Sequence, residues 1–168
     1  MSSESKEHKQ LGHKFIIAMW IAVMIMVYFL FENILENDYN PNQSVQITSA
    51  NEVMLQRNRY GHYVTHGKIN NQPVTFLLDT GASDISIPSK IARKLKLKAG
   101  SERRYQTANG IIVGNLTTLN SVSIGNIKLN DVRASINPAM DNDEILLGMS
   151  FLKFIEFTQR GDTLILRQ

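Results

Sequence analysis

One short stretch constrains the fold of this chain more than any other: residues Phe76 to Ser83 read Phe-Leu-Leu-Asp-Thr-Gly-Ala-Ser. An apolar run of strand type ends abruptly at Asp79, which places a carboxylate at the edge of a core, where it is costly unless it has a use. Thr80 adds a hydroxyl, and Gly81 allows close neighbours because it has no side chain. Asp, Thr and Gly are also common turn residues, so an ordinary turn after a strand is the alternative interpretation.

From Glu52 onward the chain is patterned as short strands separated by turns. Strand-type segments occur at 53–56, 60–69, 74–78, 85–87, 116–124, 127–136, 145–147, 155–157 and 164–166. Turn signals occur at Asn70-Asn71, Asn109-Gly110, Gly125-Asn126 and Gly161-Asp162. Two short helices are predicted, at 89–95 and 149–154. Many short strands, few helices and regular turns predict an all-β domain built as a closed or nearly closed barrel.

An apolar segment near the N-terminus, from Phe15 to Phe31, contains no charged residue. As a helix it spans roughly 25 Å, at the short end for a bilayer. A cleaved signal peptide is the alternative, but its apolar region is usually shorter, and the residues after Phe31 offer no small-x-small cleavage site. We therefore predict one N-terminal transmembrane helix that is not cleaved.

The charges around this segment predict its orientation. Lysines precede it, whereas Glu32, Glu36 and Asp38 follow it. Positive residues stay in the cytoplasm, so the C-terminal part should be translocated, which in a Gram-negative bacterium means an inner-membrane anchor and a periplasmic domain. The predicted organisation is a cytoplasmic tail at 1–14, a transmembrane anchor at 15–31, a polar linker at 32–50 and a folded domain at 51–168.

Composition excludes some classes of function. There is no cysteine, so the chain can have neither a disulfide nor a thiolate-based site. The net charge of +3 is too small to indicate nucleic-acid binding, and the basic cluster at 90–98 has no interleaved aromatic residues for base stacking. His62 and His66 would lie roughly 13 Å apart on a strand, too far to share a zinc ion. We expect no nucleic-acid partner, no metal and no cofactor.

Four pieces of the chain, in the right order over roughly 53–166, resemble a retropepsin-type aspartic protease of the bacterial membrane-anchored, single-lobe kind. They are Gly61-His62-Tyr63 with Gly67-Lys68-Ile69-Asn70, Asp79-Thr80-Gly81-Ala82-Ser83, Thr107-Ala108-Asn109-Gly110, and Leu146-Leu147-Gly148-Met149-Ser150-Phe151-Leu152. The resemblance implies the closed β-barrel of the acid proteases and the activity of an aspartic endopeptidase. Such enzymes hold a water between two carboxylates that share one proton, because two like charges about 3 Å apart cannot both ionise. One carboxylate takes the proton of the water, and the other donates toward the scissile carbonyl.

This chain has one Asp-Thr-Gly, so the second carboxylate must come from a second copy in a two-fold homodimer. By resemblance, the catalytic residues are Asp79, Thr80, which would hydrogen-bond across the dimer axis, and Gly81, which would present its backbone to substrate. The residues expected to line the substrate site are Ala82, Ser83, Asp84, Thr107, Ala108, Asn109 and Gly110. The last four would form a flap that closes over an extended peptide. Gly148 would let the second apolar run pack beneath the Asp79 loop.

Two positions depart from the retroviral pattern, which usually has an acid in place of Ser83 and an arginine in place of Met149. In the family these charges belong to one ionic network near the dimer interface. Because both charges are missing together, we expect one changed arrangement of this network. The alternative function is a non-catalytic, membrane-tethered module that binds peptides or dimerises on the same fold. The complete Asp79-Thr80-Gly81 and the flap-like hairpin argue against it.

Overall fold

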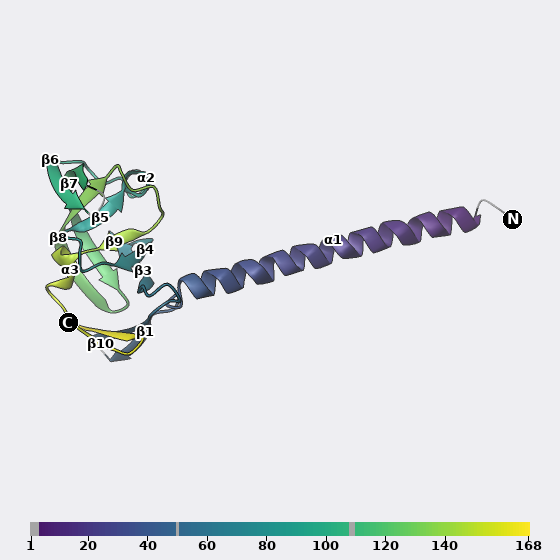
Figure 1. Ribbon diagram of the computed structural model, residues 1–168, viewed down its shortest axis with the longest axis horizontal. Helices are drawn as coiled ribbons and strands as arrows, with labels where there is room; N and C mark the ends of the chain where they lie inside the picture. Colours follow the sequence, from purple (N-terminus) through teal and green to yellow (C-terminus); the bar gives the residue numbers. More distant parts are fainter. Residues whose placement is uncertain (1–3, 50, 108–109) are drawn as a thin grey trace. The chain divides into compact units, whose positions relative to one another are not determined.

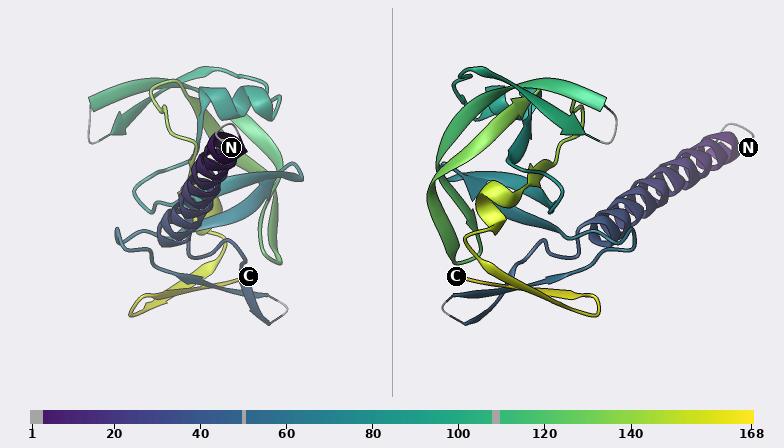
Figure 2. Two further views of the ribbon diagram at one scale, coloured as in Figure 1. Left: turned by 90° about the vertical axis from the view of Figure 1, so that its right-hand side faces the viewer. Right: turned by 60° about the vertical axis from the view of Figure 1, so that its left-hand side comes forward.

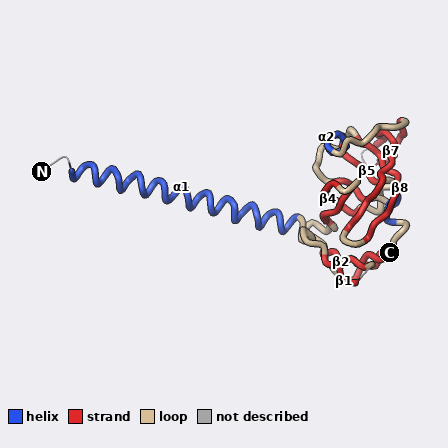
Figure 3. The backbone as a smooth tube through the Cα atoms, turned by 180° about the vertical axis from the view of Figure 1, so that it is seen from behind, coloured by secondary structure: helices blue, strands red, loops and turns tan. Residues whose placement is uncertain are grey.

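The structure is a computed structural model and describes residues 4–49, 51–107 and 110–168. The chain divides into two compact units, 1–38 and 39–168. Helix α1 (Glu4–Tyr39) accounts for the described part of the first unit, and strands make up most of the second (Figures 1 and 3). The expected all-β domain with short helices after one N-terminal helix is therefore confirmed.

Helix α1 is longer than the predicted 15–31 helix. It continues through the charged residues after Phe31 because they include good helix formers such as Glu32 and Glu36 and no glycine or proline. It ends at Tyr39 because the following residue precedes Pro41 and is therefore disfavoured in helical conformation. The stretch Lys14–Tyr39 is long and apolar enough to cross a membrane, a test that a signal sequence near the N-terminus also meets.

The segment predicted as a linker, 32–50, has more structure than its polar composition indicated. Its first part belongs to α1, and strand β1 (Gln46–Ser49) pairs antiparallel with β2 (Glu52–Gln56). Asn42 is buried, and its side chain donates to the carbonyls of Gln56 and Val64, both at 2.8 Å, and accepts from the Gln56 amide at 2.6 Å. The polar residues of this segment thus bind the folded domain.

The smaller of two sheets has the order β1-β2-β11-β10, with every pair antiparallel. Strands β10 (Glu156–Arg160) and β11 (Thr163–Arg167) form the predicted hairpin, and Gly161 at its turn has φ +59°. Alternate residues of β2 and β11 are buried in the core, as the period of a half-buried strand requires. Figure 2 shows this sheet as the blue and yellow strands at the bottom of both views.

The larger sheet closes on itself. Its order is β3-β4-β9-β5-β8-β7-β6, and an additional pairing of β3 with β7 completes a barrel and leaves β6 outside the ring. The strands are β3 (Val64–Ile69), β4 (Gln72–Leu78), β5 (Ile85–Pro88), β6 (Glu102–Thr107), β7 (Gly110–Ile124), β8 (Ile127–Asn137) and β9 (Ile145–Leu147). The predicted turn between β3 and β4 is confirmed, since Asn70 and Asn71 both have positive φ, as a tight hairpin turn requires.

Two short helices and a buried core complete the domain. Helices α2 (Ser89–Lys94) and α3 (Met149–Leu152) end one and two residues before the predicted limits. Strand β3 begins later than expected because the side chain of Asn58 accepts from the amides of Tyr60 and His62 and holds these residues in a turn. The largest fully buried side chains come from both sheets and α3: Phe76, Phe151, Leu55, Ile69, Ile85, Ile87, Leu119, Ile124, Ile127, Ile145, Leu147 and Leu152.

Candidate active site

Asp79 stands where β4 leaves the barrel. Strand β4 runs parallel to β9, with Leu78 opposite Leu147, and the amide of Asp79 donates to the carbonyl of Leu147 at 3.2 Å. Both strands lie inside the sheet; β9 is mostly buried, and the last three residues of β4, at 76–78, are apolar. The carboxylate is thus carried at the end of a rigid element.

The loop that follows, residues 79–84, is fastened from below by the start of α3. The amides of Met149 and Ser150 donate to the carbonyls of Ala82 and Ser83, at 2.8 and 3.0 Å. A Cβ on Gly148 would lie 2.5 Å from the Ala82 oxygen and 2.3 Å from the Asp84 oxygen, closer than atoms can approach. The absence of a side chain at Gly148 therefore permits this packing, as the sequence led us to expect.

The Asp79 carboxylate is oriented by its own turn. Its Oδ1 accepts a hydrogen bond from the Gly81 amide at 2.8 Å. A Cβ on Gly81 would lie 3.1 Å from the same oxygen. Among the residues that the structure describes, none donates a hydrogen bond to Oδ2, and the Asp79 side chain lines a pocket of about 360 Å³.

The pocket lies between the 79–84 loop and the hairpin of β6 and β7. The residues that line it are Asp79, Gly81, Ala82, Ser83, Asp84, Ser86, Tyr105, Gln106, Thr107, Ile112, Ser135, Asn137 and Leu146. The pocket therefore brings together six of the predicted site residues: Asp79, Gly81, Ala82, Ser83, Asp84 and Thr107. Thr80 lines a neighbouring depression of about 280 Å³, together with Arg133, Met149 and Lys153.

The predicted flap falls partly within the described residues. Strands β6 and β7 pair with Thr107 opposite Gly110, and the Thr107 hydroxyl donates to the Gly110 carbonyl at 2.8 Å. Gly110 is not among the residues that line the pocket. Ala108 and Asn109, which were also predicted to bind substrate, lie outside the described residues.

Sequence reasoning missed a polar network around Asp84. The side chain of Asp84 is 1% exposed, and its Oδ1 accepts from Arg133 Nε at 2.7 Å. Its Oδ2 accepts from the Tyr105 hydroxyl at 3.0 Å, and Ser135 lines the same pocket as Tyr105. Burial raises the pKa of Tyr105, the Ser135 contact lowers it and the Asp84 contact raises it further, so the phenol stays protonated at neutral pH.

A signal for this network was present but incomplete. Arg133 and Ser135 are two residues apart on a strand that the sequence predicted, so they lie on one face of it. Nothing in the local pattern indicated that this face meets Asp84, which is 49 residues from Arg133 along the chain.

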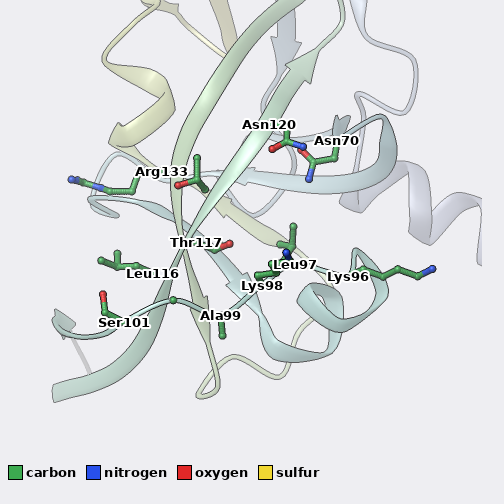
Figure 4. A pocket seen from close by; sticks show the side chains of 12 residues that line it. Asn70, Lys96, Leu97, Lys98, Ala99, Ser101, Leu116, Thr117, Asn120 and Arg133 are labelled. Atoms are coloured by element: carbon green, nitrogen blue, oxygen red, sulfur yellow. The ribbon is translucent and has the colours of Figure 1, made fainter.

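A larger pocket, of about 690 Å³, lies beside the segment between α2 and β6 (Figure 4). Its lining includes Lys96, Lys98 and Arg133, but Figure 4 shows the side chains of Lys96 and Arg133 pointing in opposite directions at its two ends. The cations therefore do not converge on one ligand position, and the lining contains no carboxylate or histidine for acid–base chemistry. The Asp79 pocket is the better candidate for an active site.

Comparisons with known proteins agree with this geometry. Residues 65–154 match the family model described as gag-polyprotein putative aspartyl protease. An uncharacterized protein encoded in the cobV 5′ region of Sinorhizobium sp is 31% identical over 167 residues, which cover 90% of this chain and 72% of that protein. Uncharacterized protein RP867 of Rickettsia prowazekii (strain Madrid E) is 33% identical over 165 residues, with 90% and 70% covered.

A solved structure extends the comparison to three dimensions. The crystal structure of a retropepsin-like aspartic protease from Rickettsia conorii superposes with a TM-score of 0.58 at 40% sequence identity, over 68% of this chain and 89% of that one. The chain therefore belongs to the family of retropepsin-like aspartic proteases.

Proposed function

We propose that this protein is a membrane-anchored aspartic endopeptidase whose active site forms when two copies each supply Asp79. The observation that carries the proposal is the position of Asp79. It stands at the end of an interior strand of the barrel, on a loop packed closely against Gly148, and it lines a pocket whose other side is formed by the β6–β7 hairpin. This placement occurs in a chain of the retropepsin-like family.

The proposed chemistry needs only residues of the two copies. The two Asp79 carboxylates hold one proton and one water between them. The ionised carboxylate takes a proton from the water while the water oxygen attacks the scissile carbonyl carbon. The protonated carboxyl donates its proton to the carbonyl oxygen. Thr80 joins the two loops across the axis, and Gly81 offers its backbone to the peptide. No metal or cofactor takes part.

The substrate of this site is an extended peptide. Ala82, Ser83 and Thr107 line the pocket from opposite sides, and Ile112 and Leu146 give it apolar walls. An extended chain between the loop and the hairpin makes main-chain hydrogen bonds as an added strand does, and the pocket accepts one of its side chains. Ala108, Asn109 and Gly110 belong to the flap in this proposal.

Helix α1 is the proposed membrane anchor. Its apolar stretch, Lys14–Tyr39, leaves its side chains exposed within the structure and is long enough to span a bilayer. With lysines before the uncharged segment 15–31 and Glu32, Glu36 and Asp38 after it, the protease domain lies in the periplasm of a Gram-negative cell and the first residues lie in the cytoplasm. The protease domain then begins near Tyr39, earlier than the boundary predicted at residue 51.

The decisive experiment compares the full chain in detergent with its Asp79→Asn variant on a peptide library. We expect Asp79→Asn to lower kcat/KM at least about a hundredfold, because it removes the group that accepts the proton of the water. Asp162→Asn is the matched control, since Asp162 is an exposed carboxylate paired with Arg57 in another part of the domain. Equal cleavage by the wild type and Asp79→Asn would refute the proposal. Peptide binding without cleavage by either form would favour the non-catalytic alternative.

A further inference from the structure

We propose that Asp84 is a positioning residue, neutralised by Arg133, that fastens strand β6 of the hairpin to the catalytic loop and does not itself contact substrate. The inference deepens the proposed function, because it assigns a role within the same site, and its kinetic consequence rests on that function. It changes the expectation that Asp84 binds substrate.

The first argument is that the Asp84 carboxylate is already occupied. Its side chain is 1% exposed, and each of its oxygens accepts a hydrogen bond from the protein, from Arg133 Nε and from the Tyr105 hydroxyl. A buried charge is tolerated when it is paired and hydrogen-bonded, and both conditions hold here. A peptide could bind the Asp84 carboxylate only by displacing one of these two hydrogen bonds, so the carboxylate is better suited to hold Arg133 and Tyr105 in place.

The second argument is that the network joins three separate elements. Asp84 ends the loop that begins with Asp79, Arg133 and Ser135 come from β8, and Tyr105 comes from β6. All of these residues except Arg133 line the Asp79 pocket. The distance between the loop and the hairpin, which sets the width of the pocket, is therefore linked to the hydrogen bond between Tyr105 and Asp84.

The third argument is the position of β6. This strand is at the end of the larger sheet and pairs with β7 alone among the described strands. Backbone pairing fixes its register with β7 but not its tilt toward the loop. The Tyr105 side chain is half-buried, and its hydrogen bond to Asp84 connects β6 to the 79–84 loop, a connection that the backbone pairing does not provide.

The first test measures the effect of the hydrogen bond between Tyr105 and Asp84 without any assay of activity. In the full chain in detergent, Tyr105→Phe removes one hydroxyl and keeps the ring. We expect amide hydrogen exchange in 102–107 and 111–115 to accelerate about fivefold, the change expected when one hydrogen bond of ordinary strength is lost. Exchange in 156–167 should not change. Tyr60→Phe, which alters an exposed tyrosine bonded to Arg59, should change neither segment. Unchanged exchange in 102–107 would overturn the inference.

The second test is kinetic. Tyr105→Phe and Asp84→Asn should each raise KM about fivefold and change kcat less than twofold, because they loosen the binding cleft and leave the reacting groups in place. Their effects should not add: the double variant should be no worse than the worse single one, since both alter the same contact between Tyr105 and Asp84. Additive effects, or a loss confined to kcat, would contradict the proposal. Asp162→Asn is the control for removal of an arginine-paired carboxylate.

The two proposals can fail separately. If the wild type cleaves nothing while Tyr105→Phe still accelerates exchange in β6, the positioning role stands and the protease proposal falls. If the wild type cleaves peptides and Tyr105→Phe changes neither exchange nor KM, the positioning role falls and the protease proposal stands. The exchange test and the single-variant kinetics can be decided with Tyr105→Phe alone, so a folding defect in Asp84→Asn does not prevent a decision.

Discussion

The glycine beneath the 79–84 loop shows how one residue can decide the geometry of a site. Gly148 has ordinary backbone angles, φ −90° and ψ −173°, so its role is purely steric. Any side chain would enter the space held by the carbonyls of Ala82 and Asp84. Those carbonyls belong to the loop that carries Asp79, so a shift there reaches the carboxylate.

Replacing this glycine with alanine should therefore damage both stability and cleavage. We expect Gly148→Ala to lower the free energy of unfolding of the 39–168 fragment by about 3 kcal/mol, measured by urea denaturation, because the added methyl overpacks backbone that cannot move freely. Gly161→Ala is the control: it has open space around it but φ +59°, and should cost about 1 kcal/mol with no effect on cleavage. A smaller loss for Gly148→Ala than for Gly161→Ala would show that the loop adapts.

At the scale of elements, the segment between α1 and β2 belongs to the compact unit 39–168. Asn42 satisfies backbone groups of two strands at once, Gln56 on β2 and the Val64 carbonyl on β3. A single isolated bridge between Asn42 and Thr65 adds to this contact. Strand β1 then extends the smaller sheet, although it is only four residues long.

Removal of the Asn42 side chain should destabilise this arrangement. Asn42→Ala deletes three hydrogen bonds and leaves buried backbone groups unpaired, so we expect the free energy of unfolding of the 39–168 fragment to fall by about 2–4 kcal/mol. Asn142→Ala, an exposed asparagine bonded to Glu144, should change it by less than about 0.5 kcal/mol. Equal effects of the two substitutions in urea denaturation would mean that the segment is a simple linker after all.

At the scale of the whole molecule, the proposed active site is complete only when two chains meet. Each chain has one Asp-Thr-Gly, and Thr80 faces a depression on the outside of the loop, where Met149 and Lys153 also lie. Confinement by an anchor at α1 would raise the local concentration of chains and favour pairing without any additional contact.

Mixing of chains tests the shared site directly. When wild-type chains and an equal amount of Asp79→Asn chains are co-reconstituted in liposomes, random pairing leaves half of the wild-type chains in mixed dimers, so activity per wild-type chain should fall to about half. Wild type mixed with Asp162→Asn should keep full activity per chain. Activity per wild-type chain that is independent of the mixing ratio would indicate a site within one chain.

The features that the sequence determined by itself are those that depend on neighbours along the chain. The turns at Asn70-Asn71 and Gly161-Asp162 follow from residues that accept positive φ, and both hairpins formed as predicted. The apolar runs ending at Asp79 and Gly148 became adjacent parallel strands of the barrel. These local signals, taken in order, were enough for the fold and for the loop that carries Asp79.

The features that only the tertiary structure decided involve partners far apart in sequence. The segment around Asn42 was predicted as a linker from its polar composition, and the hydrogen bonds of Asn42 could not be foreseen because its partners on β2 and β3 are 14 and 22 residues away. Asp84 was predicted to line the substrate site, and its hydrogen bonds could not be foreseen because their partners, Tyr105 and Arg133, are 21 and 49 residues away. The sequence does not show whether a given polar side chain is buried or exposed. The hydrogen bonds that make its burial tolerable form only when distant strands pack together.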